Sequence, residues 1–307
     1  MPGPRHGIPT EAASAILCSG LTKDYGQGRG LFDLDLDLSP GEVFGFIGPN
    51  GAGKTTTIRL LMDLIRPTRG RADVLGMDTH VDSIAIKRRV GYLPGELPQF
   101  PGARARHVLD LLSGLRGGVD PARIRSLAAR LELDLNRRYS DLSHGNKQKV
   151  GLIQAFMHSP EVLILDEPTM GLDPLMQREF WRLVKEAVGG GASVLLSSHV
   201  LNEVELGCNR IGLIRQGHLV RIGSLDELRT TRVHRVQATL DRPAAAGLLA
   251  GLPGVSDVEL QGNKVSCAVQ GSVGPLLGRL LEHSVVELDS RELSLEEVFL
   301  HEFEPIA

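Results

Sequence analysis

Residues 48–56 are Gly-Pro-Asn-Gly-Ala-Gly-Lys-Thr-Thr, and this run narrows the possible folds more than any other part of the chain. It fits the P-loop spacing G-x-x-x-x-G-K-[ST]. An apolar, β-prone run precedes it at 42–47, and a run typical of a helix follows it at 57–65. Strand, glycine-rich loop and helix is the setting that the motif requires, so we predict an α/β P-loop fold.

The composition of this loop suits a bound triphosphate. Glycines let backbone N–H groups turn towards the phosphates, and the N-terminus of the following helix adds partial positive charge. Lys54 can reach the β- and γ-phosphate oxygens, while the hydroxyl of Thr55 can ligate Mg²⁺. The predicted phosphate-binding residues are Gly48, Pro49, Asn50, Gly51, Ala52, Gly53, Lys54, Thr55 and Thr56.

The bulk properties exclude several classes of protein. The 307 residues suffice for one large domain and a small one, and 42% of them are hydrophobic. A formal net charge of −3 gives no basic footprint for nucleic acid. Three cysteines that lie far apart lack metal-binding spacing and suit a reducing compartment. No window approaches 18 uninterrupted apolar residues, so we expect a soluble chain. The first residues lack the apolar segment of a signal peptide, so residues 1–13 are expected to form a flexible tail.

Strands alternate with helices after the P-loop. Apolar runs at 162–165 and 193–197 predict buried strands, and a helical pattern at 176–188 lies between them. Residues 211–222 predict two strands joined by a turn, and residues 98–160 are mostly helical. This order implies a mainly parallel α/β core.

Two more strands are predicted before the P-loop. Residues 15–21 are typical of an opening strand, and residues 31–38 alternate apolar and acidic side chains with period two. The alternation places Asp33, Asp35 and Asp37 in one row. We interpret this row as a solvated sheet face, and the alternative is a metal site.

The composition changes near residues 228–233, and a small second domain is predicted from 234 to 307. Its elements follow the order βαββαβ, the ferredoxin-like pattern, and an amphipathic helix at 294–303 is expected to close it. The region contains no cluster of chemically active residues, so we interpret it as a packing or regulatory module. Its predicted strands lie at 236–240, 255–260, 264–269 and 285–288, and its predicted helices at 244–252 and 275–283.

Two adjacent acids, Asp166 and Glu167, follow the apolar run 162–165. Burying both carboxylates unpaired would be expensive, so we expect them to meet a cation or solvent. Asp166 fits the Walker B role of holding Mg²⁺, and Glu167 is placed to polarise an attacking water. The alternative, an acidic pair that merely ends a strand, is weakened by the P-loop in the same chain.

Three further motifs occur in a characteristic order. Residues 142–148, Leu-Ser-His-Gly-Asn-Lys-Gln, match a signature usually written LSGGQ. Residues 171–174, Gly-Leu-Asp-Pro, resemble a D-loop, and residues 197–200, Ser-Ser-His-Val, resemble a switch-histidine loop. With the P-loop and the Asp-Glu pair, they make residues 14 to about 230 resemble the nucleotide-binding subunit of an ABC transporter. The resemblance implies a RecA-like core with a helical subdomain at about 98–160.

In that family, two subunits placed head to tail enclose two ATP molecules with Mg²⁺. The resemblance implies that Leu142, Ser143 and Gly145 face the γ-phosphate held by the P-loop of a second copy. A signature at a helix N-terminus suits an anion, because unpaired N–H groups point at it. Asp173 would communicate across the dimer.

The resemblance also assigns two ring-bearing side chains. His199 would hydrogen-bond the γ-phosphate and position water, and its alternative is a structural histidine at the end of a strand. Tyr25 lies where the family places an aromatic residue that stacks on adenine. The alternative for Tyr25 is a simple core or surface aromatic.

Two departures from the family pattern matter. His144 and Asn146 stand where the signature usually has Gly and Gln, although the Ser and the second Gly of the signature are retained. The family normally places Gln directly after the proline of Gly-Tyr-Leu-Pro, where it touches Mg²⁺ and couples to the membrane subunit. That position is Gly95 here. Glu96 and Gln99 are the alternatives for this role, which the sequence leaves unassigned.

The pattern in 142–177 and the ending Ser294–Leu300 are similar to ATPases of bacterial ABC-2 type exporters, including their antibiotic-resistance branch. The resemblance implies export of drugs, lipids or polysaccharides through a separate transmembrane permease. The chain would then be cytoplasmic, peripheral on the inner face of the cell membrane. The competing class is a soluble ABC ATPase acting on the ribosome or on DNA. The single P-loop motif and the lack of sustained heptads disfavour it. A third alternative, a P-loop kinase or GTPase, would not explain the signature or residues 197–200.

Overall fold

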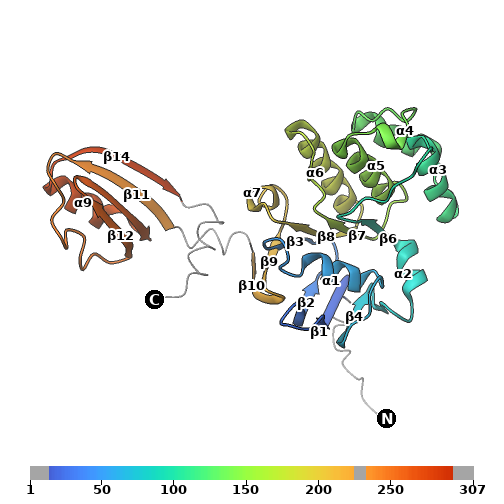
Figure 1. Cartoon of the computed structure of the whole chain (residues 1–307), viewed down its shortest axis with the longest axis horizontal. Helices are drawn as coiled ribbons and strands as arrows, with labels where there is room; N and C mark the ends of the chain where they lie inside the picture. The colour runs from blue at the N-terminus through green and yellow to red at the C-terminus, as the bar shows by residue number, and fades with distance from the viewer. Residues whose placement is uncertain (1–13, 225–232, 293–307) are drawn as a thin grey trace, which may run out of the picture. The chain divides into compact units, whose positions relative to one another are not determined.

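The computed structural model describes residues 14–224 and 233–292 (Figure 1). The chain divides into two compact units, Met1–Gly223 and Ser224–Ala307, which are described separately.

A six-stranded sheet forms the centre of the first unit, with strand order β10-β9-β3-β8-β7-β6. The pairs β3–β8, β3–β9, β7–β8 and β6–β7 are all parallel. Every residue of β3 and β7 is buried, as expected for strands covered on both faces. The predicted parallel α/β core is therefore confirmed. The strands are β3 (Val43–Ile47), β6 (Val90–Leu93), β7 (Val162–Asp166), β8 (Ser193–Ser198), β9 (Arg210–Arg215) and β10 (His218–Ser224).

A second sheet with strand order β2-β1-β4-β5 belongs to the same unit, and its pairs are antiparallel. In β2 the leucines are buried and the aspartates are exposed, which follows the period-two pattern of the sequence. Asp33 pairs with Arg69 at 2.8 Å, and Asp35 accepts a hydrogen bond from the backbone N–H of Gly20. The structure thus favours a solvated face over a metal site. The strands are β1 (Ile16–Asp24), β2 (Gly30–Leu38), β4 (Arg69–Val74) and β5 (Met77–Asp78).

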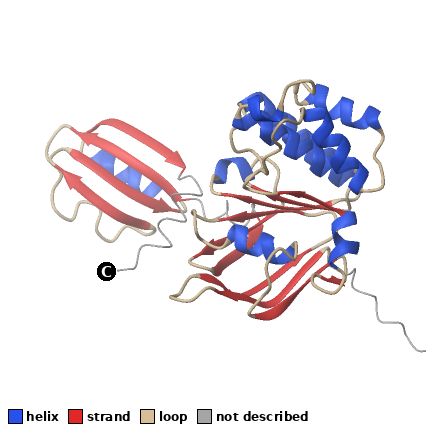
Figure 2. Cartoon of the chain, turned by 45° about the vertical axis from the view of Figure 1, so that its right-hand side comes forward, coloured by secondary structure: helices blue, strands red, loops and turns tan. Residues whose placement is uncertain are grey.

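The helices lie in two places relative to the six-stranded sheet. Helix α1 lies between the two sheets, and the longer helices cover the opposite face of the six-stranded sheet (Figures 1 and 2). The main core cluster accordingly includes Phe44 and Phe46 of β3, Ile58 of α1 and Leu34 of β2. The helices are α1 (Lys54–Leu61), α2 (Ser83–Arg89), α3 (Ala105–Leu115), α4 (Pro121–Arg130), α5 (His144–Phe156), α6 (Pro174–Gly189) and the short α7 (Leu201–Val204), with a 3₁₀ turn at Tyr139–Asp141.

Local sequence explains where the longer helices begin. Asp120 caps α4 by accepting from the N–H of Ala122, and Asp173 caps α6 by accepting from the N–H of Leu175. A proline follows each cap, at the first helical position, where a missing N–H costs nothing. Helix α1 starts three residues earlier than predicted and ends at Leu61, so the predicted helix 57–65 was placed too late at both ends.

The second unit contains one four-stranded antiparallel sheet and helix α9. Its strand order, β12-β13-β11-β14, is that of the predicted βαββαβ arrangement. The helix predicted at 244–252 was wrong, because this segment forms turns with i→i+3 bonds such as Leu248 N–H to Ala245 O. Gly247 interrupts it with a φ of +85°. The elements are β11 (Val233–Leu240), β12 (Val255–Gln261), β13 (Lys264–Gln270), α9 (Gly274–Glu282) and β14 (Val285–Glu292); the predicted helix 294–303 lies outside the described residues.

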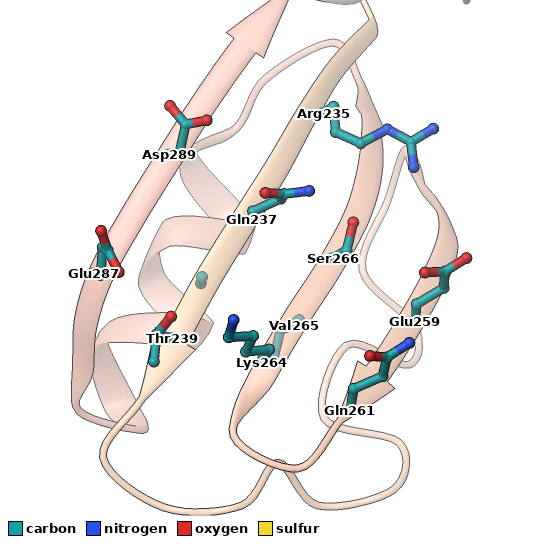
Figure 3. Close-up of a pocket in the computed structure, with 11 residues that line it drawn as sticks. Arg235, Gln237, Thr239, Glu259, Gln261, Lys264, Val265, Ser266, Glu287 and Asp289 are labelled. Atoms are coloured by element: carbon teal, nitrogen blue, oxygen red, sulfur yellow. The ribbon is translucent and has the colours of Figure 1, made fainter.

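The two faces of this sheet differ. One face packs against α9 with Val236, Cys267 and Leu276 in its core. The other is polar and lines an open pocket of about 660 Å³ (Figure 3). Within residues 14–224 and 233–292, no group of three or more His, Cys, Asp and Glu side chains is placed to hold a metal ion.

Candidate nucleotide site

The P-loop connects the carboxyl end of β3 to the start of α1. A Cβ on Gly48 would lie 2.2 Å from the carbonyl oxygen of Ile214, so only glycine fits this close approach. Gly53, the N-cap of α1, has a φ of +117°, which side chains with a Cβ rarely adopt. Glycine is therefore required at the first and last glycine positions of the motif, by a close backbone contact at Gly48 and by a positive φ at Gly53.

A cavity of about 270 Å³ opens at this loop. It brings the P-loop together with Asp166 and Glu167 at the end of β7, which are more than one hundred residues away in sequence. Arg59, Gly95 and Glu96 also line it. Gly95 is the position of the missing glutamine and Glu96 one of its two alternatives, whereas Arg59 was not predicted as a site residue. The lining residues are Pro49, Asn50, Gly51, Ala52, Gly53, Lys54, Thr55, Thr56, Arg59, Gly95, Glu96, Asp166 and Glu167.

Lys54 is buried at the start of α1, with 5% of its side chain exposed. Its ammonium group donates to the carbonyl oxygens of Gly48 at 2.6 Å and Pro49 at 3.3 Å. It also pairs with Glu167 Oε1 at 3.3 Å. A buried cation surrounded by oxygen acceptors at the mouth of a P-loop is suited to phosphate oxygens, which offer stronger acceptors than carbonyls.

Thr55 and Asp166 form the candidate metal site. Thr55 Oγ1 donates to Asp166 Oδ2 at 2.8 Å, so both oxygens lie within reach of one small ion. Mg²⁺ prefers hard oxygen ligands, and it usually binds one or two protein groups together with substrate phosphates. The residues present therefore fit Mg²⁺. Asp166 is only 1% exposed. The burial of the neighbouring Tyr92, together with the negative charge of Asp166, raises the pKa of Tyr92 to about 12.

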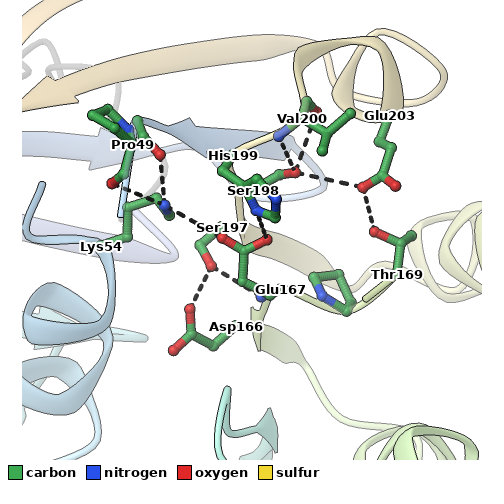
Figure 4. Close-up of polar contacts among 12 residues, drawn as sticks. Pro49, Lys54, Asp166, Glu167, Thr169, Ser197, Ser198, His199, Val200 and Glu203 are labelled. Carbon is green, nitrogen blue, oxygen red and sulfur yellow. Dashed lines mark hydrogen bonds and ion pairs between the residues drawn. The ribbon is translucent and has the colours of Figure 1, made fainter. Parts of the chain in front are cut away.

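Glu167 follows Asp166 in the chain, and its carboxylate meets His199 (Figure 4). His199 Nδ1 is 2.9 Å from Glu167 Oε2, and both side chains remain partly accessible, at 45% and 15%. Glu167 has a φ of +49°, and its backbone is held on both sides. Its N–H donates to Ser197 Oγ, and its carbonyl accepts from Gln148 Nε2. The role of Gln148 was not predicted from the sequence.

The signature residues lie at the start of α5 and are absent from the lining of the P-loop cavity described above. Ser143 is exposed and caps α5, because its Oγ accepts from the N–H of Asn146 at 3.3 Å. A Cβ on Gly145 would lie 2.3 Å from the carbonyl oxygen of Gly171, so this glycine packs against the D-loop. Leu142 is buried. Asp173 is likewise absent from the cavity lining, as the cap of α6.

The first departure, His144, is explained by the same contact between signature and D-loop. A Cβ on Gly171 would lie 2.8 Å from His144 Nδ1, so the histidine ring rests against a residue that has no side chain. The larger residue in the signature is therefore accommodated by the glycine of the D-loop.

The second departure concerns the loop after β6. A Cβ on Gly95 would lie 2.8 Å from Asp166 Oδ2, so a glutamine at this position would require the Asp166 carboxylate or the loop to shift. Of the two alternatives, Glu96 lines the cavity. Gln99 instead accepts a hydrogen bond from Lys147 at 3.5 Å.

Tyr25 lies in the turn between β1 and β2 and is 50% exposed. Lys23 Nζ is 5.5 Å from the centroid of its ring. Tyr25 is absent from the lining of the cavity, so the structure does not join its half-exposed ring to the P-loop.

The fold and the site together define a P-loop nucleotide-binding cassette. The family model described as "ABC transporter" matches residues 31–170. The chain is 36% identical over 304 residues to the daunorubicin resistance ATP-binding protein DrrA3 of Streptomyces coeruleorubidus, covering 94% of this chain and 96% of the relative. It is 32% identical to the Nod factor export ATP-binding protein I of Paraburkholderia xenovorans, covering 94% and 96%, and 31% identical to the bacitracin transport ATP-binding protein BcrA of Bacillus licheniformis, covering 94% and 97%.

Solved structures agree. An ATP-binding subunit of an ABC transporter superposes with a TM-score of 0.65 and 29% identity, covering 70% of this chain and 92% of that one. A dimeric bacterial ABC transporter cassette shares the fold with a TM-score of 0.63 and 24% identity, covering 68% and 98%. The chain belongs to the ABC transporter family, as an ATP-binding and ATP-hydrolysing cassette, which confirms the predicted family, fold and enzyme class. Among the described residues, no helix has both the length and the apolar character needed to cross a bilayer.

Proposed function

We propose that this chain is the ATPase subunit of a membrane exporter, and that two copies close around Mg·ATP and separate after hydrolysis. The observation that carries the proposal is the convergence of Lys54, Thr55, Asp166 and Glu167 on one P-loop cavity. His199 does not line this cavity but contacts Glu167 Oε2 at 2.9 Å. Relatives that match over nearly the whole chain carry resistance, export or transport in their names. The substrate class stays open, because a separate subunit would contact it.

In this proposal, Lys54 and the N-terminus of α1 hold the β- and γ-phosphates. The ammonium group exchanges its contacts with the loop carbonyls and Glu167 for phosphate oxygens, which carry more charge. Thr55 and Asp166 would hold Mg²⁺, which supplies charge neutralisation for the phosphates when bound. Asp166 suits this role because its Oδ2 already meets the Thr55 hydroxyl.

Glu167 is proposed as the residue that accepts a proton from the attacking water. A general base must lie within hydrogen-bond reach of its proton, and Glu167 lines the cavity beside the Thr55–Asp166 pair. His199 Nδ1 meets Oε2 of this carboxylate, which leaves Oε1 to face the P-loop lysine. His199 therefore orients Glu167 here and can turn to a γ-phosphate in the closed dimer.

The signature is proposed to serve the second copy. Ser143 is exposed at the N-terminus of the 13-residue helix α5, where unpaired N–H groups favour an anion. Its oxygen accepts the N–H of Asn146, so its own proton remains available for a phosphate oxygen. Because neither Ser143 nor Gly145 lines the P-loop cavity of its own chain, each site in the dimer would combine the P-loop of one copy with the signature of the other. Tyr25 would stack on adenine through its exposed ring.

A permease is proposed to dock on the α2–α3 apolar surface, which we define as Val81, Ile84, Leu111 and Leu115. These side chains are 56–80% exposed. A hydrogen bond links the two helices, because Arg116, directly after α3, donates to the carbonyl oxygen of Lys87 in α2. Such a partner would hold the chain at the inner face of the membrane.

The core of the proposal is tested by phosphate release from ATP by the purified full chain with and without Mg²⁺. Lys54→Ala should weaken ATP binding at least tenfold and abolish release, because it removes the buried cation of the loop. Lys185→Ala, an exposed lysine on α6, is the matched control and should behave as the wild type. Equal nucleotide affinity of the Lys54→Ala variant and the control in calorimetry would overturn the assignment.

A further inference from the structure

Ser197 is a buried side chain that makes two hydrogen bonds, one to the candidate metal ligand and one to the backbone of the candidate base (Figure 4). It lies near the end of β8 and has no exposed surface. Its Oγ donates to Asp166 Oδ1 at 2.5 Å and accepts from the N–H of Glu167 at 3.0 Å.

The direction of both bonds follows from the atoms involved. A serine hydroxyl has one proton, and the backbone N–H of Glu167 can only donate. The hydroxyl proton is therefore committed to the carboxylate of Asp166. This divides the two oxygens of Asp166 between two partners, Oδ1 towards Ser197 and Oδ2 towards Thr55, where the metal ion would bind.

The backbone of Glu167 needs such support. Its φ of +49° is uncommon for a residue with a side chain and persists where the surroundings hold it. The Ser197 hydroxyl holds the N–H of Glu167, and Gln148 holds its carbonyl at 3.0 Å. His199, two residues after Ser197, holds the other end of the same residue, its carboxylate.

We propose that Ser197 is a positioning residue for ATP hydrolysis, which fixes Asp166 and Glu167 relative to each other through one hydroxyl group. The inference rests on the proposed function of those two acids. In this arrangement Ser197 orients the carboxylate of Asp166 and positions the backbone of Glu167, and His199 contacts the carboxylate of Glu167. No contact to nucleotide is assigned to Ser197, so its loss should leave phosphate binding by the P-loop intact.

The test replaces Ser197 with Ala and compares it with Ser193→Ala. Ser193 is the matched control, because it lies on the same strand, is 3% exposed and accepts the N–H of Gly41 far from the acids. Mn²⁺ is titrated onto each full chain saturated with a non-hydrolysable ATP analogue, and free Mn²⁺ is measured by electron paramagnetic resonance. Outer partners of metal ligands typically alter metal affinity by about 10–100-fold, so Ser197→Ala should weaken Mn²⁺ binding by about tenfold or more.

Turnover separates the two effects of the hydroxyl. Saturating Mg²⁺ should restore part of the lost rate in Ser197→Ala, and the remaining loss in kcat would report the displaced Glu167. Metal-free binding of the ATP analogue should equal that of the Ser193→Ala control. Should Ser197→Ala not fold, Ser197→Cys replaces it, because a thiol keeps the volume and is a weaker donor.

The outcomes distinguish this inference from the proposed function. Wild-type chain that shows no Mg²⁺-dependent hydrolysis would overturn both. Wild-type activity with equal Mn²⁺ affinity and equal kcat in the Ser197 and Ser193 variants would overturn the role of Ser197 alone. Weaker Mn²⁺ binding in Ser197→Ala, with analogue binding unchanged, supports it.

Discussion

Replacing Glu167 with Gln changes the proposed base while leaving its shape. In the structure, Glu167 contacts Lys54 at 3.3 Å through Oε1 and His199 at 2.9 Å through Oε2. Glutamine can meet both neighbours, but its amide cannot take a proton from water. Loss of a general base lowers a rate by about 10²–10⁴-fold, which corresponds to about 2.7–5.4 kcal/mol of activation free energy. ATP affinity should be equal or higher, because a negative charge beside the triphosphate is removed.

The assay combines single-turnover hydrolysis with size-exclusion chromatography in Mg·ATP. Glu167→Gln should accumulate as an ATP-bound dimer and release phosphate at least one hundred times more slowly than wild type, on the scale expected for a lost base. Glu161→Gln is the control, a carboxylate just before the other end of β7 that pairs with Arg89 and should keep normal turnover. A Glu167→Gln rate within tenfold of wild type, with bound ATP, would remove Glu167 from the role of base.

Three further outcomes are expected. Glu96→Gln should raise the affinity for metal-free ATP severalfold in calorimetry, because a carboxylate that lines the cavity repels the phosphates. Unchanged affinity would mean that Glu96 lies too far from the bound phosphates to affect them. Ile84→Asp with Leu115→Asp should reduce co-purification with a membrane subunit while leaving ATP affinity unchanged, and retained co-purification would exclude the α2–α3 apolar surface. Burial, aided by the charge of Arg116, lowers the pKa of His158 from 6.5 to about 4, so protonation favours unfolding. The free energy of unfolding, measured by urea denaturation, should therefore fall as pH drops from about 6.5 to 4. His158→Gln should make this quantity less dependent on pH over the same range.

The sequence predicted those parts of the fold and site that local patterns determine. The P-loop was placed by its glycine spacing, and β3 and β7 by continuous apolar runs that leave them fully buried. The pair Asp166–Glu167 was placed at the end of a strand. Their meeting with Lys54 and Thr55 follows from a parallel sheet, which gathers the carboxyl ends of its strands at one edge.

Other features depend on contacts between distant segments. The close approach of Gly95 to the carboxylate of Asp166 joins positions 71 residues apart in the chain, and the role of Gln148 arises from the carbonyl of Glu167. Neither has a local signal. The helix predicted at 244–252 failed for a local reason, since Gly247 and Gly251 both adopt positive φ. An apolar periodicity there could not report the backbone conformation.

The sharing of each ATP site between two copies is tested most directly by mixing two inactive variants. Lys54→Ala disables the P-loop, and Ser143→Arg blocks the signature with a bulky side chain. In a mixed dimer, the intact P-loop of one copy meets the intact signature of the other, so one of two sites is restored. Random pairing of equal amounts should then recover about a quarter of wild-type ATPase activity from two inactive proteins. No recovery, with mixed dimers demonstrated by two affinity tags, would mean that each chain builds its site alone.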